Sequence, residues 1–370
     1  MARFSTARLA LLVAVLFAAG SVLAGGCSSP AAQSVSGPAP AAVSSPEPDR
    51  PPSASSAPPS APRELRRITV AYPTSAVTMT GFYIAIQEGF TVEEGLDAEM
   101  VLMNGTLGAQ GMVAHQVDFG MSAGATLAAA LRGAPLRLVF VQIDKPLFFL
   151  FTQPEIQTAA ELEGKSVGIA AVGDSTQLAT KATLKGLGAN PEAISYVANI
   201  TGPQSVAALQ SGSVAGAAVS APYDLIAQRV GFRNLGFMGD YLDYLTAGLA
   251  THEDLIKDQP DLVHATLRAE IKAHRYMQQN RLGTIAHMAR FLEITPEDAA
   301  EAYDAYMKYL TADGTSTPDV LERILRDQRS AFSEQGIETQ SASVNDMFRL
   351  ESARRANAEL DRAGWHPNPQ

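Results

Sequence analysis

Short apolar runs and helix-length segments alternate along residues 65 to 250 of the chain. The runs at 66–72 (RRITVAY), 96–103 (LDAEMVLM) and 136–143 (LRLVFVQI) have the length and apolar content of buried or half-buried strands. The segment 80–90 (TGFYIAIQEGF) repeats its apolar residues at helical spacing and reaches a glycine near its end. Strands separated by helices of this length predict right-handed βαβ units and mostly parallel sheets that are covered on both faces.

The same order of elements begins again after residue 159. Further strands and helices are predicted in alternation at 165–171, 175–188, 194–199, 204–212, 214–220 and 223–231. The stretches GMVAHQVDFGMSAG (111–124) and AALQSGSVAGAAVSAP (207–222) both lead from a helix end through a short strand to a serine, Ser122 or Ser220. This weak internal repeat predicts two similar α/β lobes with a cleft between them, in which ligands bind beyond the carboxyl ends of the strands.

The two lobes are expected to be joined by strand crossings near 144–152 and 240–250. From Asp254 onward the pattern is helical, and Thr295 and Thr317 each stand before a proline, as capping residues do at the start of a helix. The expected division is lobe 1 at 65–146, lobe 2 at 147–246, a helical return to lobe 1 at 247–345, and a C-terminal helix and tail at 346–370.

The N-terminal segment 1–26 has the pattern of a secretory signal. A positive start is followed by a charge-free run from Leu9 to Ala24, which is shorter than the roughly 20 residues of a spanning helix. Small residues then lead to Cys27, the single cysteine of the chain. The stretch resembles a bacterial lipoprotein signal, which implies that Cys27 is acylated and tethers the protein to a membrane. The alternative is a soluble-secretion site with an incidental cysteine.

Composition and charge narrow the classes of partner. Residues 27–64 consist mainly of Ala, Ser and Pro and are expected to form a disordered linker after the lipidated cysteine. The net charge is −10, and Arg63, Arg66 and Arg67 form the only basic cluster. Nucleic acid and anionic membrane surfaces are therefore excluded as expected partners, and a lipid anchor is the one expected membrane contact. We expect a monomer outside the cytoplasm.

One motif favours a catalytic interpretation. Residues 120–124 (GMSAG) match the G-x-S-x-G nucleophile elbow around Ser122, and Asp240 or Asp243 followed by His252 supplies the chain order of a hydrolase. No HGGG-type oxyanion segment precedes the motif, and Ser220 occupies the corresponding turn of the second lobe. Small residues also suit any tight turn. We therefore expect no catalytic residue and keep the serine hydrolase as the enzyme alternative.

The histidines and carboxylates give no second candidate for chemistry. The six histidines are scattered through the sequence, at positions 115, 252, 264, 274, 287 and 366, and no H-E-x-x-H motif is present. Glu270 and His274 share a helix face, which is typical of a solvated pair. We expect no metal site and no cofactor.

Four stretches resemble the substrate-binding components of ABC importers for nitrate, sulfonate, taurine and thiamine pyrimidines, the NMT1/SsuA-like family. The stretches are 85–105, 115–139, 159–195 and 207–224, and their most specific parts are EGLD (94–97), VDFG (117–120) and LEGK (162–165). The resemblance implies a two-lobed, periplasmic-binding-protein-like fold of type II. It also implies capture of a small solute in the inter-lobe cleft and delivery to ABC permease subunits. An enzyme of the superfamily has a cysteine-rich motif, which this chain lacks.

The resemblance also implies cleft residues. In lobe 1 these are Tyr72, Thr78, Met79, Thr80, Phe82, Asn104, Ser122 and Ala123. In lobe 2 they are Gly173, Asp174, Ser175, Thr176, Gln177, Gln204, Ser220, Pro222 and Tyr223. The alternative for each is an ordinary turn or cap residue. Binders of anions often supply a cation, whereas these loops contain no Lys or Arg and include Asp174. Together with the aromatic side chains, this favours a neutral, aromatic or amphipathic solute. A sensory subunit that serves a receptor instead of a permease is the alternative role.

Overall fold

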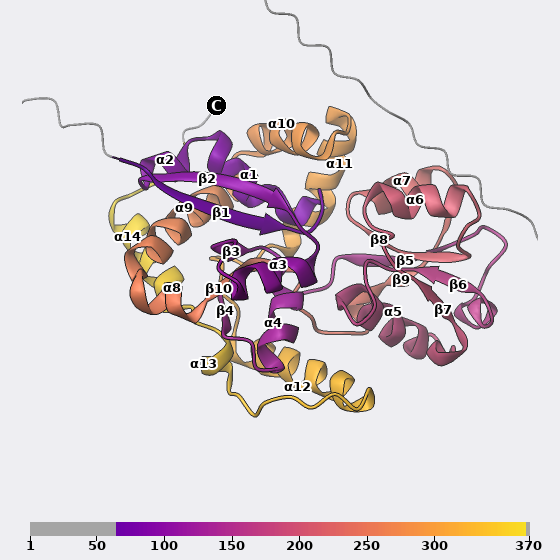
Figure 1. The fold of residues 1–370 in the computed structure, drawn as a ribbon. Coiled ribbons are helices and arrows are strands. Elements are labelled where there is room, and N and C mark those ends of the chain that lie inside the picture. Colours follow the sequence, from indigo (N-terminus) through magenta and orange to yellow (C-terminus); the bar gives the residue numbers. More distant parts are fainter. Residues whose placement is uncertain (1–63, 368–370) are drawn as a thin grey trace, which may run out of the picture. The chain divides into compact units, whose positions relative to one another are not determined.

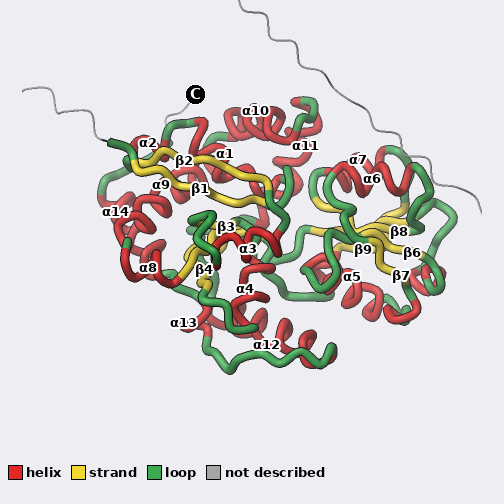
Figure 2. The backbone as a smooth tube through the Cα atoms, viewed as in Figure 1, coloured by secondary structure: helices red, strands yellow, loops and turns green. Residues whose placement is uncertain are grey.

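The structure is a computed structural model, and it describes residues 64–367 of the chain. The expected signal segment, Cys27 and nearly all of the expected linker lie outside the described residues. The described part contains two five-stranded sheets with helices packed on their faces (Figures 1 and 2). No helix in this part is long and apolar enough to cross a membrane.

The first sheet combines four strands of one direction with one reversed strand. Its order is β2-β1-β3-β10-β4. The strands are β1 (Arg66–Tyr72), β2 (Leu96–Leu102), β3 (Phe119–Gly120), β4 (Leu136–Ile143) and β10 (Ala247–His252). β1 pairs in parallel with β2 and β3, whereas β10 runs antiparallel to both β3 and β4. The three predicted strands at 66–72, 96–103 and 136–143 are therefore confirmed, and they share one sheet.

The second sheet repeats this arrangement in the order β7-β6-β8-β5-β9. The strands are β5 (Phe148–Thr152), β6 (Ser166–Gly168), β7 (Ser195–Val197), β8 (Gly216–Ser220) and β9 (Arg233–Phe237). β6 is parallel to β7 and β8, and β5 is antiparallel to β8 and β9. In each sheet the reversed strand, β10 or β5, is the one that enters from the other half of the chain. The expected two-lobed α/β fold is thus present, with two mixed sheets that are mostly parallel.

Helices cover both sheets. Those of lobe 1, the part built on the first sheet, are α1 (Thr80–Gln87), α2 (Phe90–Glu93), α3 (Gly105–Val113), α4 (Ala123–Leu131), α8 (Glu253–Asp258), α9 (Pro260–Gln279), α10 (Arg281–Leu292), α11 (Pro296–Tyr306), α12 (Pro318–Glu334), α13 (Val344–Met347) and α14 (Glu351–Arg362). Those of lobe 2, built on the second sheet, are α5 (Ser175–Gly186), α6 (Pro203–Gln210) and α7 (Tyr223–Arg229). Short 3₁₀ turns lie at Val77–Met79, Ala159–Leu162, Pro191–Ala193, Met238–Asp240 and Met307–Tyr309.

Local sequence signals explain several helix boundaries. The predicted helix at 80–90 is divided in two because Gly89 has a φ of 76°, a left-handed conformation that ends α1 and precedes α2. Thr295 Oγ1 accepts the Asp298 N–H at 3.1 Å, and Thr317 Oγ1 accepts the Val320 N–H at 3.4 Å. Both predicted threonine caps are therefore confirmed.

The core of each lobe follows from burial on both faces of its sheet. In the second sheet, Leu150 packs in one apolar cluster while its neighbour Phe151 packs in another on the opposite face. In the first sheet, Phe119 and Phe140 are fully buried beneath α9 and its neighbours. Strands covered on both faces need apolar residues at successive positions, which is why these runs are nearly continuous in the sequence.

Candidate functional site

A cavity of about 260 Å³ lies where the loops at the carboxyl ends of strands from both sheets meet. From lobe 1, the segment after β1, the start of α3 and the start of α4 line it. From lobe 2, the loops after β6 and β7 and the end of β8 line it. The two crossing segments contribute Leu147, Phe148 and Thr246. The cavity is thus at the position that the doubly repeated α/β arrangement predicts.

Helix N-termini in the lining differ in how they are capped. Asn104 Oδ1 accepts the Leu107 N–H at 2.9 Å at the start of α3. By contrast, α4 begins after Ser122 and α6 begins after Gly202 without a side-chain cap. The first N–H groups of a helix have no partner within the helix. At α6 the first residue is Pro203, and the N–H groups of Gln204 and Ser205 already donate to the backbone oxygens of Thr201 and Gly202. The start of α4 can therefore donate to a polar group in the cavity, whereas that of α6 cannot.

Asp174 organises the start of α5. Its Oδ1 accepts the N–H groups of Thr176 and Gln177, at 3.0 and 3.1 Å, and the Thr176 hydroxyl at 2.7 Å. Burial raises the pKa of Asp174 because desolvation disfavours the carboxylate. Asp174 is the one ionisable residue among the described residues that line the cavity, and it is acidic. The lining therefore offers no positive side chain to an anion.

The Ser220 hydroxyl is the polar group of the lining that most clearly needs a hydrogen-bond partner. Ser220 is the last residue of β8, it lines the cavity, and its Oγ is buried without a hydrogen-bond partner among the described residues. A buried hydroxyl without a partner costs about 1–3 kcal/mol, so such groups usually meet water or a ligand. Ser122 lines the other side, where its Oγ lies against Gly105: a Cβ built at Gly105 would be 2.5 Å from it.

The predicted cleft residues divide into two sets. Those that line the cavity are Thr78, Met79, Asn104, Ser122, Asp174, Ser175, Thr176, Gln204 and Ser220. Those outside the lining are Tyr72, Thr80, Phe82, Ala123, Gly173, Gln177, Pro222 and Tyr223. A role in solute binding stays a prediction for all of them.

Packing explains why several predicted aromatic residues lie outside the lining. Phe82 is fully buried in α1 and belongs to the core of lobe 1. Tyr72 packs on Phe291, with ring centroids 5.9 Å apart. The Tyr223 hydroxyl donates to the backbone oxygen of Ser75 at 3.2 Å, so this residue bridges the lobes. The aromatic ring that does line the cavity is that of Phe148.

Sequence reasoning missed the loop after β7. Asn199, Ile200, Thr201 and Gly202 all line the cavity. The internal repeat could have identified them, because β7 occupies the place in its sheet that β2 has in the first, and Asn104 follows β2.

The hydrolase interpretation fails on geometry. β10 is antiparallel to β3, with Thr251 opposite Phe119, so His252 lies at the edge of the sheet away from Ser122. Four strand positions separate the two residues along the sheet, which corresponds to about 13 Å at 3.3 Å per residue. Asp243 is paired with Arg323 at 2.9 Å. A nucleophile and its base must lie within hydrogen-bond reach, and His252 does not.

Solved structures of other proteins share the two-lobed fold of this chain. The alkanesulfonate-binding protein SsuA from Xanthomonas axonopodis pv. citri, bound to MOPS, is 16% identical with a TM-score of 0.66, covering 78% of this chain and 99% of its own. The periplasmic nitrate-binding protein NrtA from Synechocystis PCC 6803 is 14% identical with a TM-score of 0.66, covering 83% and 92%. The desulfurization enzyme DszB is 14% identical with a TM-score of 0.57, covering 79% and 99%. At these identities the likeness shows the shared fold alone.

Sequence comparison is more specific about the family. No curated protein matches the chain. The family described as NMT1/THI5 like matches residues 76–281, which is more than half of the chain and spans both lobes. The chain belongs to the NMT1/THI5-like family.

Proposed function

We propose that this protein is an extracytoplasmic solute-binding component of an ABC importer. It captures one small solute in the cavity between the lobes and presents it to the permease, and it is not an enzyme. The observation that carries the proposal is the buried Ser220 hydroxyl, which has no hydrogen-bond partner in the described part of the chain and lies in a cavity lined from both sheets. SsuA and NrtA, which share the fold, are binding proteins for an alkanesulfonate and for nitrate.

The proposed solute is small and uncharged. A sulfonate or nitrate group would lie near the Asp174 carboxylate without a lysine, arginine or histidine in the described lining to balance its charge. Met79, Phe148 and Ile200 offer apolar surface, while Ser220 and the start of α4 offer hydrogen bonds. An aromatic or amphipathic compound with one polar group satisfies both parts of the lining.

Binding acts through closure of the lobes. The Val77 N–H donates to the backbone oxygen of Ala221 at 3.4 Å, and the Tyr223 hydroxyl donates to that of Ser75 at 3.2 Å. Both bonds join a loop of lobe 1 to a loop of lobe 2 beside the cavity. A solute that contacts both lobes favours this arrangement by its higher affinity for it.

A thermal-shift panel of uncharged aromatic, pyrimidine and amphipathic compounds tests the proposed solute class, with nitrate and MOPS as anionic probes. A compound at about 100 times its dissociation constant stabilises the protein by about 2.7 kcal/mol. We expect an uncharged compound to raise Tm, and Ser220→Ala to weaken its affinity about 3- to 30-fold, because one hydrogen bond is lost. Ser333→Ala, at an exposed position of α12, is the matched control. Stabilisation by nitrate or MOPS alone would contradict the proposed class.

The location and the transport role need their own tests. We propose that Cys27 is lipidated and that the protein is membrane-anchored. Cys27→Ser should then release it from washed membranes, and a variant that stays membrane-bound would contradict the anchor. Cells without the protein should lose uptake of the identified solute. If these cells keep their uptake although the purified protein binds the solute, the protein serves a receptor instead of a permease.

A further inference from the structure

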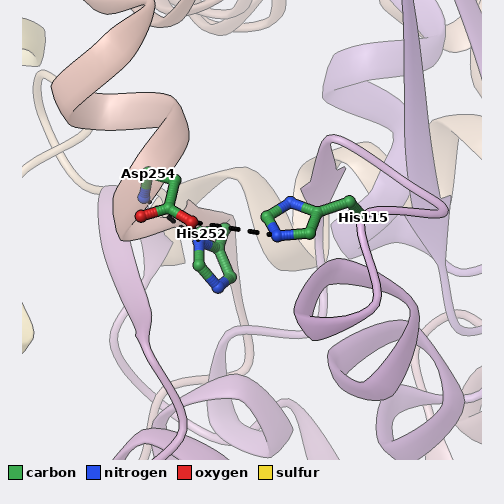
Figure 3. A group of neighbouring side chains, drawn as sticks. All are labelled: His115, His252 and Asp254. Atoms are coloured by element: carbon green, nitrogen blue, oxygen red, sulfur yellow. Dashed lines mark hydrogen bonds and ion pairs between the residues drawn. The ribbon is translucent and has the colours of Figure 1, made fainter.

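His115 meets His252 and Asp254, which are more than 130 residues away in the sequence, at one edge of lobe 1 (Figure 3). His115 Nε2 lies 3.8 Å from Asp254 Oδ2, and His252 Nδ1 lies 3.4 Å from the same oxygen. The two imidazole rings are 4.5 Å apart between centroids. One nitrogen from each histidine and one carboxylate oxygen all lie within 4.8 Å of one another. The spacing of the histidines along the chain did not predict this cluster.

The backbone conformation sets the direction of both histidine side chains. His115 follows α3 with a φ of 54°, a left-handed conformation that glycine or asparagine usually adopts at a helix end. The neighbouring Gln116 N–H donates to the Gly111 oxygen at 2.8 Å, which closes the last turn of the helix. His252 ends β10 and caps α8, with its Nδ1 accepting the Asp254 N–H at 3.1 Å. The cluster is therefore formed by two fixed helix ends.

The cluster is separate from the proposed solute cavity. Because Thr251 lies opposite Phe119 in antiparallel β10, His252 is at the amino end of β3, whereas Ser122 is beyond its carboxyl end. None of the three residues lines the cavity. A ligand bound by the cluster would leave the cavity open.

We propose that His115, His252 and Asp254 form a binding site for a divalent transition metal such as Zn²⁺. Zinc binds imidazole nitrogen and carboxylate oxygen at about 2.0–2.2 Å in tetrahedral sites, which places neighbouring ligand atoms about 3.3 Å apart. The observed separations of 3.4 and 3.8 Å are close to that value.

The remaining adjustment is small because two of the three side chains are exposed at the surface. The side chains of His115 and Asp254 are 62% and 61% exposed, so both can turn toward a metal. His252 Nδ1 would exchange its bond from the Asp254 N–H for the metal. The fourth position is open to water. Two imidazoles favour a transition metal over Mg²⁺ or Ca²⁺, which prefer oxygen ligands. The metal would join the end of α3 to the start of α8.

Titration calorimetry with Zn²⁺, on the full chain isolated without a histidine tag, tests the site. We expect one equivalent to bind and Tm to rise with Zn²⁺ concentration. His115→Asn keeps a residue that tolerates a positive φ, and His252→Asn keeps a side-chain oxygen that caps α8. Each variant should bind Zn²⁺ at least about tenfold more weakly, since even outer partners of metal ligands contribute 10- to 100-fold. His366→Asn, at an exposed position, is the matched control and should bind as the wild type does.

Cobalt provides a second readout. Co²⁺ bound to the wild type should give visible absorption bands that both asparagine variants lose. The proposal is overturned if the wild type binds no Zn²⁺, if both asparagine variants retain wild-type affinity, or if Mg²⁺ binds as tightly as Zn²⁺. These outcomes leave the proposed solute function untouched, because the two sites are separate.

Discussion

The Tyr306 hydroxyl donates a hydrogen bond to the Asp224 carboxylate and so joins α11 of lobe 1 to α7 of lobe 2. Both side chains are buried, and burial raises the pKa of Asp224 to about 6. One turn further along α7, Arg229 forms ion pairs with Asp298 and Glu301 of α11, at 2.5 and 2.7 Å. None of these residues lines the cavity, so the contacts join the lobes outside it, and the exposed ion pairs contribute less than the buried bond.

Tyr306→Phe should weaken closure of the lobes. The change leaves the buried Asp224 carboxylate without its donor, which costs about 1–3 kcal/mol. We expect a lower Tm and a larger radius of gyration by small-angle scattering. Tyr303→Phe is the matched control, because the Tyr303 hydroxyl donates to the Met277 oxygen at 2.8 Å within lobe 1. An equal increase in radius for both variants would show that the Tyr306 bond does not hold the lobes.

Glu270 should make stability depend on pH. Burial raises its pKa to about 8 from 4.5, and its Oε2 has no hydrogen-bond partner among the described residues. The folded protein then holds a proton that the unfolded chain releases, so stability falls as pH rises from about 4.5 to 8 and stays lower above that. Glu270→Gln removes this loss.

The difference between wild type and Glu270→Gln isolates this group from others that titrate. At pH 9 the variant should be more stable by a few kcal/mol, since one unit of pKa difference corresponds to about 1.4 kcal/mol, whereas near pH 4 the two should agree. Denaturant unfolding across pH measures this, with Glu322→Gln at an exposed position as the control. A constant difference at all pH values would refute the buried-carboxyl explanation.

Gly124 should prove to be a packing requirement of the GMSAG motif. A Cβ built at Gly124 would lie 2.0 Å from Tyr244 Cε1, so alanine forces the ring or α4 to move. We expect Gly124→Ala to lower the free energy of unfolding by about 1–3 kcal/mol or more. Gly108→Ala is the matched helical control. Its Cβ would lie 3.4 Å from Ala71 Cβ, an ordinary contact, and alanine is favoured in helices by about 0.5–1 kcal/mol. If both changes stabilise the protein, the close approach of Gly124 to the Tyr244 ring is contradicted.

Strands that contain their own run of large apolar residues could be predicted from the sequence. Strands that depend on pairing with their neighbours could be predicted only in part. β1 and β4 contain several large apolar residues in succession, and both were predicted. β10 reads AGLATH, and its position was expected only as a crossing. All six residues of β10 are buried, so no alternation marks it, and its partners β3 and β4 define it as a strand. β3, the short strand expected within 111–124, pairs over two residues only.

Helix packing changed one expectation about polar residues and formed an aromatic contact that the sequence does not indicate. Glu270 and His274 were expected to be a solvated pair, which is wrong: their exposed fractions are 2% and 0%, because α9 is covered by α1, α2 and α14. Spacing along a helix shows a shared face but not what covers it. Trp365 follows the last helix in a polar stretch, yet its ring packs edge-on against Phe90, with centroids 5.5 Å apart.

The candidate site was predicted best where a loop begins a helix. Asn104, Asp174 and Ser122 precede helices after strand ends, and all line the cavity. Tyr72 lies outside the lining because adjacent strand residues face opposite sides of the sheet, and its ring packs on Phe291. Phe148 lines the cavity from a crossing segment, whose course depends on how the two lobes pack.

A crystal structure with the compound that raises Tm most tests directly whether the cavity between the lobes binds an uncharged solute. We predict electron density for an uncharged solute in the cavity between the lobes, with a polar atom about 2.7–3.1 Å from Ser220 Oγ and no covalent bond to Ser122. A solute bound outside this cavity, an anionic group held beside Asp174, or a covalent adduct on Ser122 would contradict the proposed role of the cavity.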